Sequence, residues 1–146
     1  MLHLLVKDKI VKKIIFFCLG LILFLSCSVD DDRITLVYEF LPIESINLPE
    51  EFRIGTIYVI DYTYYKPTTC YGYFDLYYRV DENERTLAVM NAVYEESNCE
   101  PSEFELVEQT FNFSALEYDS YIFKIWQGED ENGEDVFLTY EIPVVD

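Results

Sequence analysis

Cysteine and histidine are the side chains with the most chemistry to offer, and this sequence holds few of them. Its 146 residues include four cysteines and a single histidine, which is the third residue of the chain. Residues 27–146 contain no imidazole to act as a general base, a metal ligand or a pH switch. The sequence therefore argues against Ser-His-Asp and Cys-His catalysis, histidine zinc sites and haem ligation in this part of the chain.

Carboxylates are the other reactive groups, and they are abundant. A pair of them can hydrolyse a glycosidic bond, but in a chain with 28 acidic residues such pairs arise by chance. The acidic segment Gly128–Asp135 concentrates oxygen ligands, yet its order does not match an EF-hand loop. A charged hairpin turning at Asn132-Gly133 is favoured there over a calcium site. We predict a protein that is not an enzyme and that needs no cofactor or metal.

The N-terminal segment has the pattern of an export signal. Four lysines precede an apolar run of twelve residues, from Ile14 to Leu25. A membrane-spanning helix needs about 20 apolar residues. The run therefore favours a cleavable signal peptide at residues 1–26 over a permanent transmembrane helix.

The end of that run carries a motif. Leu23-Phe24-Leu25-Ser26-Cys27 resembles the bacterial lipobox, which implies cleavage before Cys27 and a lipid on its thiol; the alternative is an ordinary cleavage site with an unmodified cysteine. Residues 27–33 are an acidic tether. Ser28-Val29-Asp30-Asp31-Asp32 resembles the export signal of Bacteroidetes surface lipoproteins, with a plain solvated tether as the alternative. The resemblance implies an outer-membrane lipoprotein exposed at the cell surface.

Charge limits the partners of the exported part. Residues 1–26 hold four of the ten basic and one of the 28 acidic residues, which leaves six basic and 27 acidic residues and a net charge of −21. Such a surface repels phosphate backbones and anionic head groups. We therefore expect no nucleic-acid partner, and membrane attachment only through the lipid anchor.

Period-two alternation of apolar and polar residues predicts strands across residues 34–146. Seven strands at short spacing are typical of an antiparallel two-sheet sandwich, and the predicted fold class is all-β and immunoglobulin-like. The predicted strands cover residues 34–40, 56–65, 71–80, 85–94, 103–113, 119–126 and 135–144.

Asp119-Ser120-Tyr121-Ile122-Phe123 is similar to the start of the sixth strand of immunoglobulin-like domains, where a tyrosine corner lies. The resemblance implies that Tyr121 forms the corner and that Phe123 takes the place of the usual cysteine; the alternative is that Tyr121 is an ordinary inward strand residue. Cys70 and Cys99 fall in the second-to-third and fourth-to-fifth strand connections, which meet at one end of such a sandwich. In an oxidising compartment this predicts a Cys70–Cys99 disulfide.

Tyrosine is the most conspicuous residue type, with 13 copies. Strict alternation along the third predicted strand places Phe74, Leu76, Tyr78 and Val80 toward the core. Tyr71, Tyr73 and Tyr77 then face outward. An outward row of tyrosines could stack on sugars or anchor a protein; the alternative is cross-strand pairing on a half-buried sheet face.

The sequence as a whole resembles the small surface lipoproteins of flavobacteria and their relatives, for which no defined activity is implied. The leading hypothesis is a module that binds an envelope protein or an extracellular partner. A glycan-binding sandwich that uses the outward tyrosines is the first alternative, and a structural spacer is the second.

Overall fold

Alternating side chains after residue 35 produce strands, as the sequence predicts. The computed structural model describes residues 35–94, 98–102 and 105–146, which belong to one compact unit, Ile34–Asp146. The signal peptide at residues 1–26, the lipidation site at Cys27 and the tether at residues 27–33 lie outside the described residues. Within the described ranges, no helix has the length and apolar character needed to cross a membrane.

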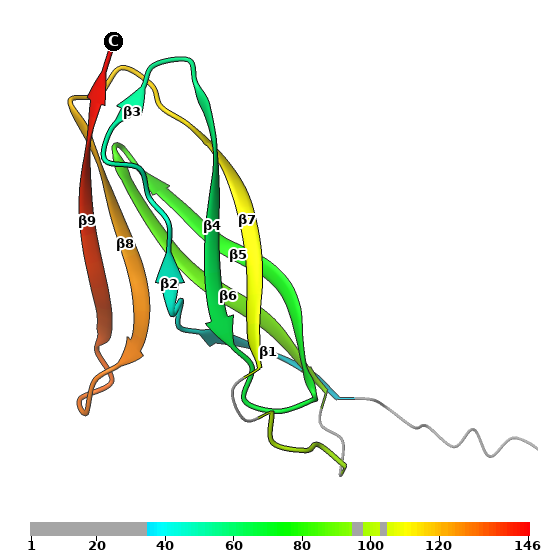
Figure 1. Ribbon diagram of the computed structural model, residues 1–146. Helices are drawn as coiled ribbons and strands as arrows, with labels where there is room; N and C mark the ends of the chain where they lie inside the picture. Colours follow the sequence, from blue (N-terminus) through cyan, green and yellow to red (C-terminus); the bar gives the residue numbers. More distant parts are fainter. Residues whose placement is uncertain (1–34, 95–97, 103–104) are drawn as a thin grey trace, which may run out of the picture. The chain divides into compact units, whose positions relative to one another are not determined.

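Within the described residues, seven long strands and two short ones make up the fold (Figure 1). The long strands agree with the predicted ones to within three residues at either end, and the all-β class is confirmed. The strands of this described part are β1 (Leu36–Leu41), β2 (Ser45–Ile46), β3 (Phe52–Arg53), β4 (Ile57–Tyr65), β5 (Tyr71–Asp81), β6 (Glu84–Tyr94), β7 (Leu106–Ser114), β8 (Ser120–Glu129) and β9 (Asp135–Val145).

The strands form two sheets, which confirms the sandwich (Figure 1). The smaller sheet has the order β2-β4-β7, and all its pairs are antiparallel. The larger sheet has β5 on one side of β6 and continues on the other side through β8 and β9 to β3. On that second side, β8 pairs with residues 84–87 of β6 and β1 pairs with residues 89–94. Two strands therefore share one edge of β6.

The prediction of antiparallel pairing throughout is wrong for two pairs, because β6 with β8 and β3 with β9 are parallel. After β6 the chain crosses to the smaller sheet as β7 and returns as β8, so β6 and β8 run in the same direction. In the immunoglobulin arrangement the third and sixth long strands are neighbours. Here β6 lies between the corresponding strands, β5 and β8.

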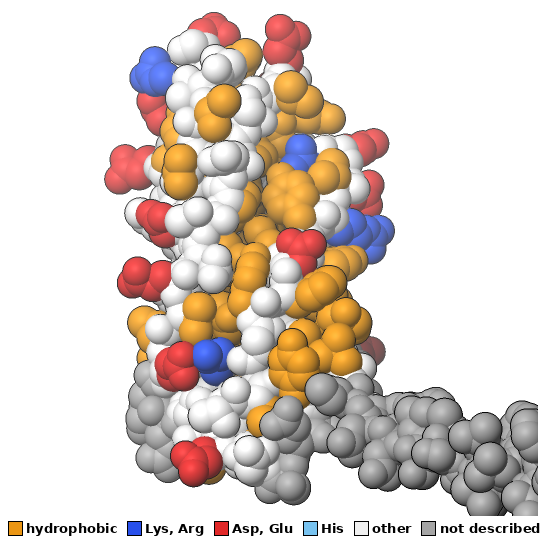
Figure 2. Space-filling view, turned by 90° about the vertical axis from the view of Figure 1, so that its right-hand side faces the viewer, with side chains coloured by type: hydrophobic (Ala, Val, Ile, Leu, Met, Phe, Trp, Pro, Cys, Tyr) orange, Lys and Arg blue, Asp and Glu red, His pale blue; other side chains and the backbone are white. Residues whose placement is uncertain are grey.

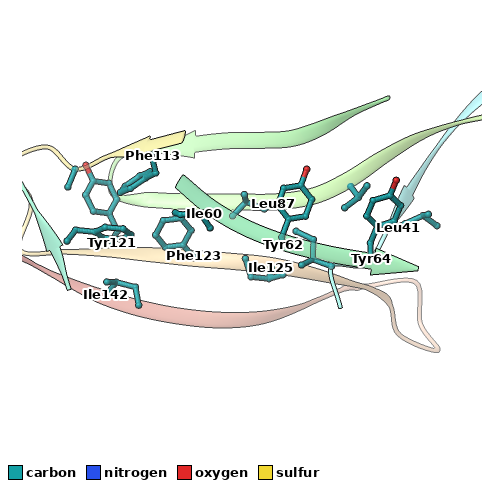
Figure 3. Packing of buried hydrophobic residues seen from close by; sticks show 14 residues of the cluster. Leu41, Ile60, Tyr62, Tyr64, Leu87, Phe113, Tyr121, Phe123, Ile125 and Ile142 are labelled. Carbon is teal, nitrogen blue, oxygen red and sulfur yellow. The ribbon is translucent and has the colours of Figure 1, made fainter. Parts of the chain in front are cut away.

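Aromatic rings fill the space between the sheets. Phe52 has its ring centroid 4.6 Å from that of Phe113, and Phe113 lies 4.9 Å from Tyr121 and 5.3 Å from Phe123. Figure 3 shows Phe113, Tyr121 and Phe123 at one end of the core, and Tyr62 and Tyr64 farther along it. Such rings bury large apolar areas, so they supply much of the hydrophobic stabilisation of this small domain.

Tyr121 has the hydrogen bond of a tyrosine corner. Its side chain is fully buried, and its hydroxyl oxygen accepts a hydrogen bond of 2.9 Å from the backbone N–H of Leu116, five residues upstream. The Arg85 guanidinium lies 4.7 Å from the centre of the Tyr121 ring, on its face. The predicted role of Tyr121 is thus matched in geometry, and Phe123 is buried beside it.

The Cys70–Cys99 disulfide is confirmed, with the two Cα atoms 5.5 Å apart. It joins the β4–β5 connection to the β6–β7 connection, as the sequence predicts. Backbone contacts support it: the Thr69 N–H donates to the Glu100 carbonyl at 2.9 Å, and Thr68 forms a bridge with Pro101. The covalent link and these contacts hold two otherwise separate loops together.

Candidate ligand-binding groove

The predicted outward row of tyrosines is only partly present. A β-bulge between Tyr73 and Asp75 shifts the register of β5 against β6. Tyr71 and Tyr73 pair with Val93 and Asn91 on the core-facing side of β6, so they turn inward and the prediction for both is wrong. A bulge adds one residue to a strand and so reverses the facing of every residue on one side of it.

Beyond the bulge the predicted facing holds for Leu76, which packs against the core, and for Tyr77, which faces outward.

Phe74, predicted to face the core, instead contacts the outward ring of Tyr38. Tyr78 contacts Phe111 between the sheets as expected, although it keeps some exposure. Val80 has the same facing as Tyr78 but is 58% exposed, so it lies beyond the buried core.

The two inward tyrosines make hydrogen bonds that a ligand-binding row would not. The Tyr73 and Tyr62 hydroxyl groups lie 3.1 Å apart, and the Tyr71 hydroxyl donates to the Glu39 carboxylate at 2.6 Å. The bond to Glu39 raises the pKa of Tyr71 to about 12, and burial raises that of Tyr64 to about 12. These phenols therefore act as structural hydrogen-bonding groups at the margin of the core. Figure 2 shows hydrophobic side chains gathered along the face of the molecule that it presents.

A groove of about 510 Å³ lies on the outer face of the larger sheet. Its position follows from the shared edge of β6. Ala88 falls between the residues of β6 that pair with β8 and those that pair with β1, so the two partner strands part beside it. The small side chains of Ala88 and Thr86 line the groove at this junction. Ala88 faces away from the core and is nevertheless only 4% exposed, because it lies in this hollow.

Four aromatic side chains line the groove: Phe40, Tyr77, Trp126 and Phe137. The Phe40 ring centroid lies 5.2 Å from Tyr77 and 6.1 Å from Trp126, in both cases edge to face. The indole N–H of Trp126 donates to the Asp135 carboxylate at 2.7 Å. That bond fixes the orientation of the indole ring, so this part of the groove is preorganised.

Charged groups complete the lining, and most of them are paired. The Lys124 ammonium lies 2.6 Å from the Glu84 carboxylate, and the Arg79 guanidinium lies 3.8 Å from that of Asp81. Glu129 and Asp135 add two further carboxylates. Two basic side chains of the five between residues 34 and 146 thus meet here with four acidic ones. The groove offers both donors and acceptors and carries a small negative charge.

The acidic hairpin between β8 and β9 uses its oxygen atoms internally. The Asp130 carboxylate accepts hydrogen bonds from the backbone N–H groups of Glu134 and Asn132, at 2.9 and 2.8 Å, and these bonds lower the pKa of Asp130. Gly133 adopts a φ of 78°, which closes the turn. Across the described ranges, no three His, Cys, Asp or Glu side chains are grouped so that they could hold a metal ion.

Sequence reasoning identified Tyr77 but missed Phe40, Trp126 and Phe137. The alternation of β8 held a usable signal, because Tyr121, Phe123 and Ile125 face the core and the only tryptophan must then face outward. Comparison with protein-family models, with curated proteins and with solved structures finds no match for this chain. Its function must therefore be argued from the groove itself.

Proposed function

We propose that this chain is an exported, lipid-anchored module that binds glycans in the groove of the larger sheet and performs no catalysis. The observation that carries the proposal is the lining, in which four aromatic rings stand beside paired charged groups over a floor of small residues. Ligand sites of this kind combine apolar surface with a few placed polar groups.

The lining suits a sugar in two ways. Aromatic faces pack against the C–H groups of a pyranose ring, and the Phe40 ring contacts both the Tyr77 ring and the Trp126 ring. Sugar hydroxyl groups both donate and accept, so they can bond to the ion pairs Lys124–Glu84 and Arg79–Asp81 without leaving a buried charge unpaired. The groove can therefore hold a polar, uncharged ligand at little cost in desolvation.

Anchoring rests on the N-terminal sequence. The lipobox that ends at Cys27 supports attachment through the thiol, and the acidic segment after it supports the cell surface as the destination. Two or more acyl chains give stable membrane binding where one gives only marginal binding. Cys27→Ser is expected to move the protein from the membrane fraction to the soluble fraction of the envelope; retention in the membrane fraction would overturn this part of the proposal.

Glycan binding is tested with an array of neutral and acidic polysaccharides, followed by calorimetric titration of the glycans that bind. Trp126→Ala should weaken binding by roughly three- to tenfold or more, since one ring stack contributes about 0.5–1.5 kcal/mol beyond its burial. Tyr65→Ala is the matched control, because Tyr65 is an exposed tyrosine on β4 in the other sheet. An array without binding, or equal affinities for the two variants, would refute the proposed site.

A protein partner is the second candidate, and a different surface favours it. Val136, Leu138 and Tyr140 of β9 face the same way as buried Ile142, yet each is 40% exposed or more. The outer edge of β9 pairs with β3 only at Val144 and Val145, and an uncovered apolar strip beside a largely unpaired strand edge is a common docking surface. Leu138→Glu should abolish capture of a cross-linked envelope protein and leave glycan binding unchanged. Capture that survives this substitution would exclude the strip as the docking surface.

A further inference from the structure

Aromatic side chains continue beyond the groove along β1. Leu41 of this strand is buried, so alternate residues Phe40 and Tyr38 face outward. Phe40 lines the groove, whereas Tyr38 lies outside it and is 50% exposed. The Tyr38 ring centroid is 4.6 Å from that of Phe74 on β5, and the two rings are inclined by 58°. A tilted ring pair therefore stands on the same outer face as the groove.

Phe74 reaches this position because of the bulge in β5. A bulge leaves one residue unpaired and interrupts the hydrogen-bond ladder, and bulges often re-aim a side chain beside a functional site. Counted back from Leu76 and Tyr78, alternation would direct Phe74 into the core, but the extra residue lets Phe74 and Asp75 both face outward. Instead 53% of the phenylalanine is exposed to water, and exposure of an aromatic side chain is unfavourable. In the unliganded protein, both the interrupted hydrogen-bond ladder and the exposed Phe74 ring are locally unfavourable, and together they place one ring next to Tyr38.

We propose that Tyr38 and Phe74 form a second sugar subsite, and that the ligand of the groove is an extended chain of neutral sugars. This inference rests on the proposed glycan-binding function and specifies its ligand class. A single sugar held in the groove beside Phe40 and Trp126 would make no use of the second ring pair, which lies outside the groove. A linear oligosaccharide that leaves the groove along β1 contacts both the groove and the Tyr38–Phe74 ring pair.

The spacing of the two subsites follows from strand geometry. Tyr38 and Phe40 are two residues apart on one strand, and a strand advances about 3.3 Å per residue. Their attachment points are thus roughly 6.6 Å apart, which is comparable to the length of one pyranose unit in a chain. Successive sugars of a linear glycan can therefore stack on successive rings without bending.

Charge selects a neutral ligand over an acidic one. The outer face around the second subsite has no basic side chain on β1 or on β5 before Arg79. Asp75 adjoins Phe74, and its carboxylate accepts the backbone N–H of Leu76 at 2.8 Å. Together with the strongly negative charge of the whole domain, this surface repels uronates and other anionic sugars. Neutral hexose chains meet no such barrier.

The test is calorimetric titration of the full-length protein in a non-glycosidic detergent. The probes are neutral oligosaccharides, from the disaccharide to the hexasaccharide, of whichever polysaccharide binds best in the array. For the wild-type protein we expect affinity to rise by roughly three- to tenfold once the chain is long enough to reach Tyr38. Tyr38→Ala and Phe74→Ala should each remove that gain and leave the affinity for the shortest binding probe unchanged. Tyr65→Ala should retain it.

The outcomes separate this inference from the proposed function. Binding that depends on Trp126 but shows no gain with chain length, or a gain that survives Tyr38→Ala, overturns the second subsite while the groove stands. A preference for an acidic oligosaccharide of equal length overturns the neutral ligand class. Failure of every probe to bind overturns the proposed function, and capture of a protein that Tyr38→Ala abolishes would assign this face to a protein partner instead.

Discussion

Replacing Tyr121 by phenylalanine deletes one oxygen atom at one end of the core (Figure 3). The ring contacts with Phe113 at 4.9 Å and with the Arg85 guanidinium at 4.7 Å do not depend on that oxygen. The hydrogen bond from the Leu116 N–H, at 2.9 Å, does depend on it. The substitution therefore isolates the hydrogen bond of the tyrosine corner from the packing of its ring.

The expected loss follows from what replaces the bond. A neutral hydrogen bond contributes about 0.5–1.5 kcal/mol to stability, and leaving a buried donor unpaired costs about 1–3 kcal/mol. The Leu116 bond is only partly buried, so water can reach the donor in part. We therefore expect Tyr121→Phe to lower the free energy of unfolding by about 1–1.5 kcal/mol.

Urea unfolding of the purified protein, with its disulfide intact, measures this loss. With a slope of about 1–3 kcal/mol/M, the midpoint should fall by roughly 0.3–1.5 M at constant slope. Tyr140→Phe is the matched control, because Tyr140 is exposed and its hydroxyl has no hydrogen-bond partner in the described structure. A loss no greater than that of the control would show that the corner hydrogen bond does not stabilise the fold. A loss above about 3 kcal/mol would show that the ring itself had moved.

Three further predictions use the same urea assay. Replacing Cys70 and Cys99 together by serine frees a link between residues 29 apart, and the chain-entropy estimate gives a loss of about 3.5 kcal/mol; a loss below about 1 kcal/mol would contradict it. Gly133→Ala should lower the free energy of unfolding by about 1–2 kcal/mol, because φ is 78° at this residue. Gly72→Ala is the control, since Gly72 has room for a Cβ atom and its substitution should not destabilise the fold. Equal effects of the two substitutions would exclude backbone strain at Gly133. The folded state raises the pKa of Tyr71 to about 12, so folding favours the neutral phenol. The resulting contribution to the free energy of unfolding is complete below pH 10, the ordinary phenol value, and is lost as the pH rises through 12. The midpoint of Tyr71→Phe should therefore fall less over that interval, and parallel declines would refute the assignment.

Strands were predictable because burial on one face imposes period two on the sequence. In β4, Ile60, Tyr62 and Tyr64 are buried, whereas the residues between them face solvent or the sheet margin. Turn residues and the Cys70–Cys99 spacing then place the connections. None of these signals reports which strand lies beside which, and that is why the parallel pair of β6 and β8 could not be foreseen.

The candidate site escaped prediction for a related reason. A bulge has no reliable mark in the sequence, so the facing of Tyr71, Tyr73 and Phe74 was inverted when alternation was followed through it. The groove itself depends on where β1 and β8 part along β6, and that position is set by sheet order. Tyr77 was placed correctly because it lies beyond the bulge, where alternation and structure agree again.

The parallel pairings also govern how the molecule folds. They join Glu84 to Ile122 and Phe52 to Val144, so long loops must close before these contacts gain any stability. The β5–β6 hairpin, by contrast, turns through two residues and can form within microseconds. Completion should then be slow, in the range of milliseconds to seconds for such a topology. For a chain exported as proposed, this delay is useful because the fold stays incomplete during export. The ring of Phe52 cannot be enclosed until the final strand, β9, has crossed the membrane.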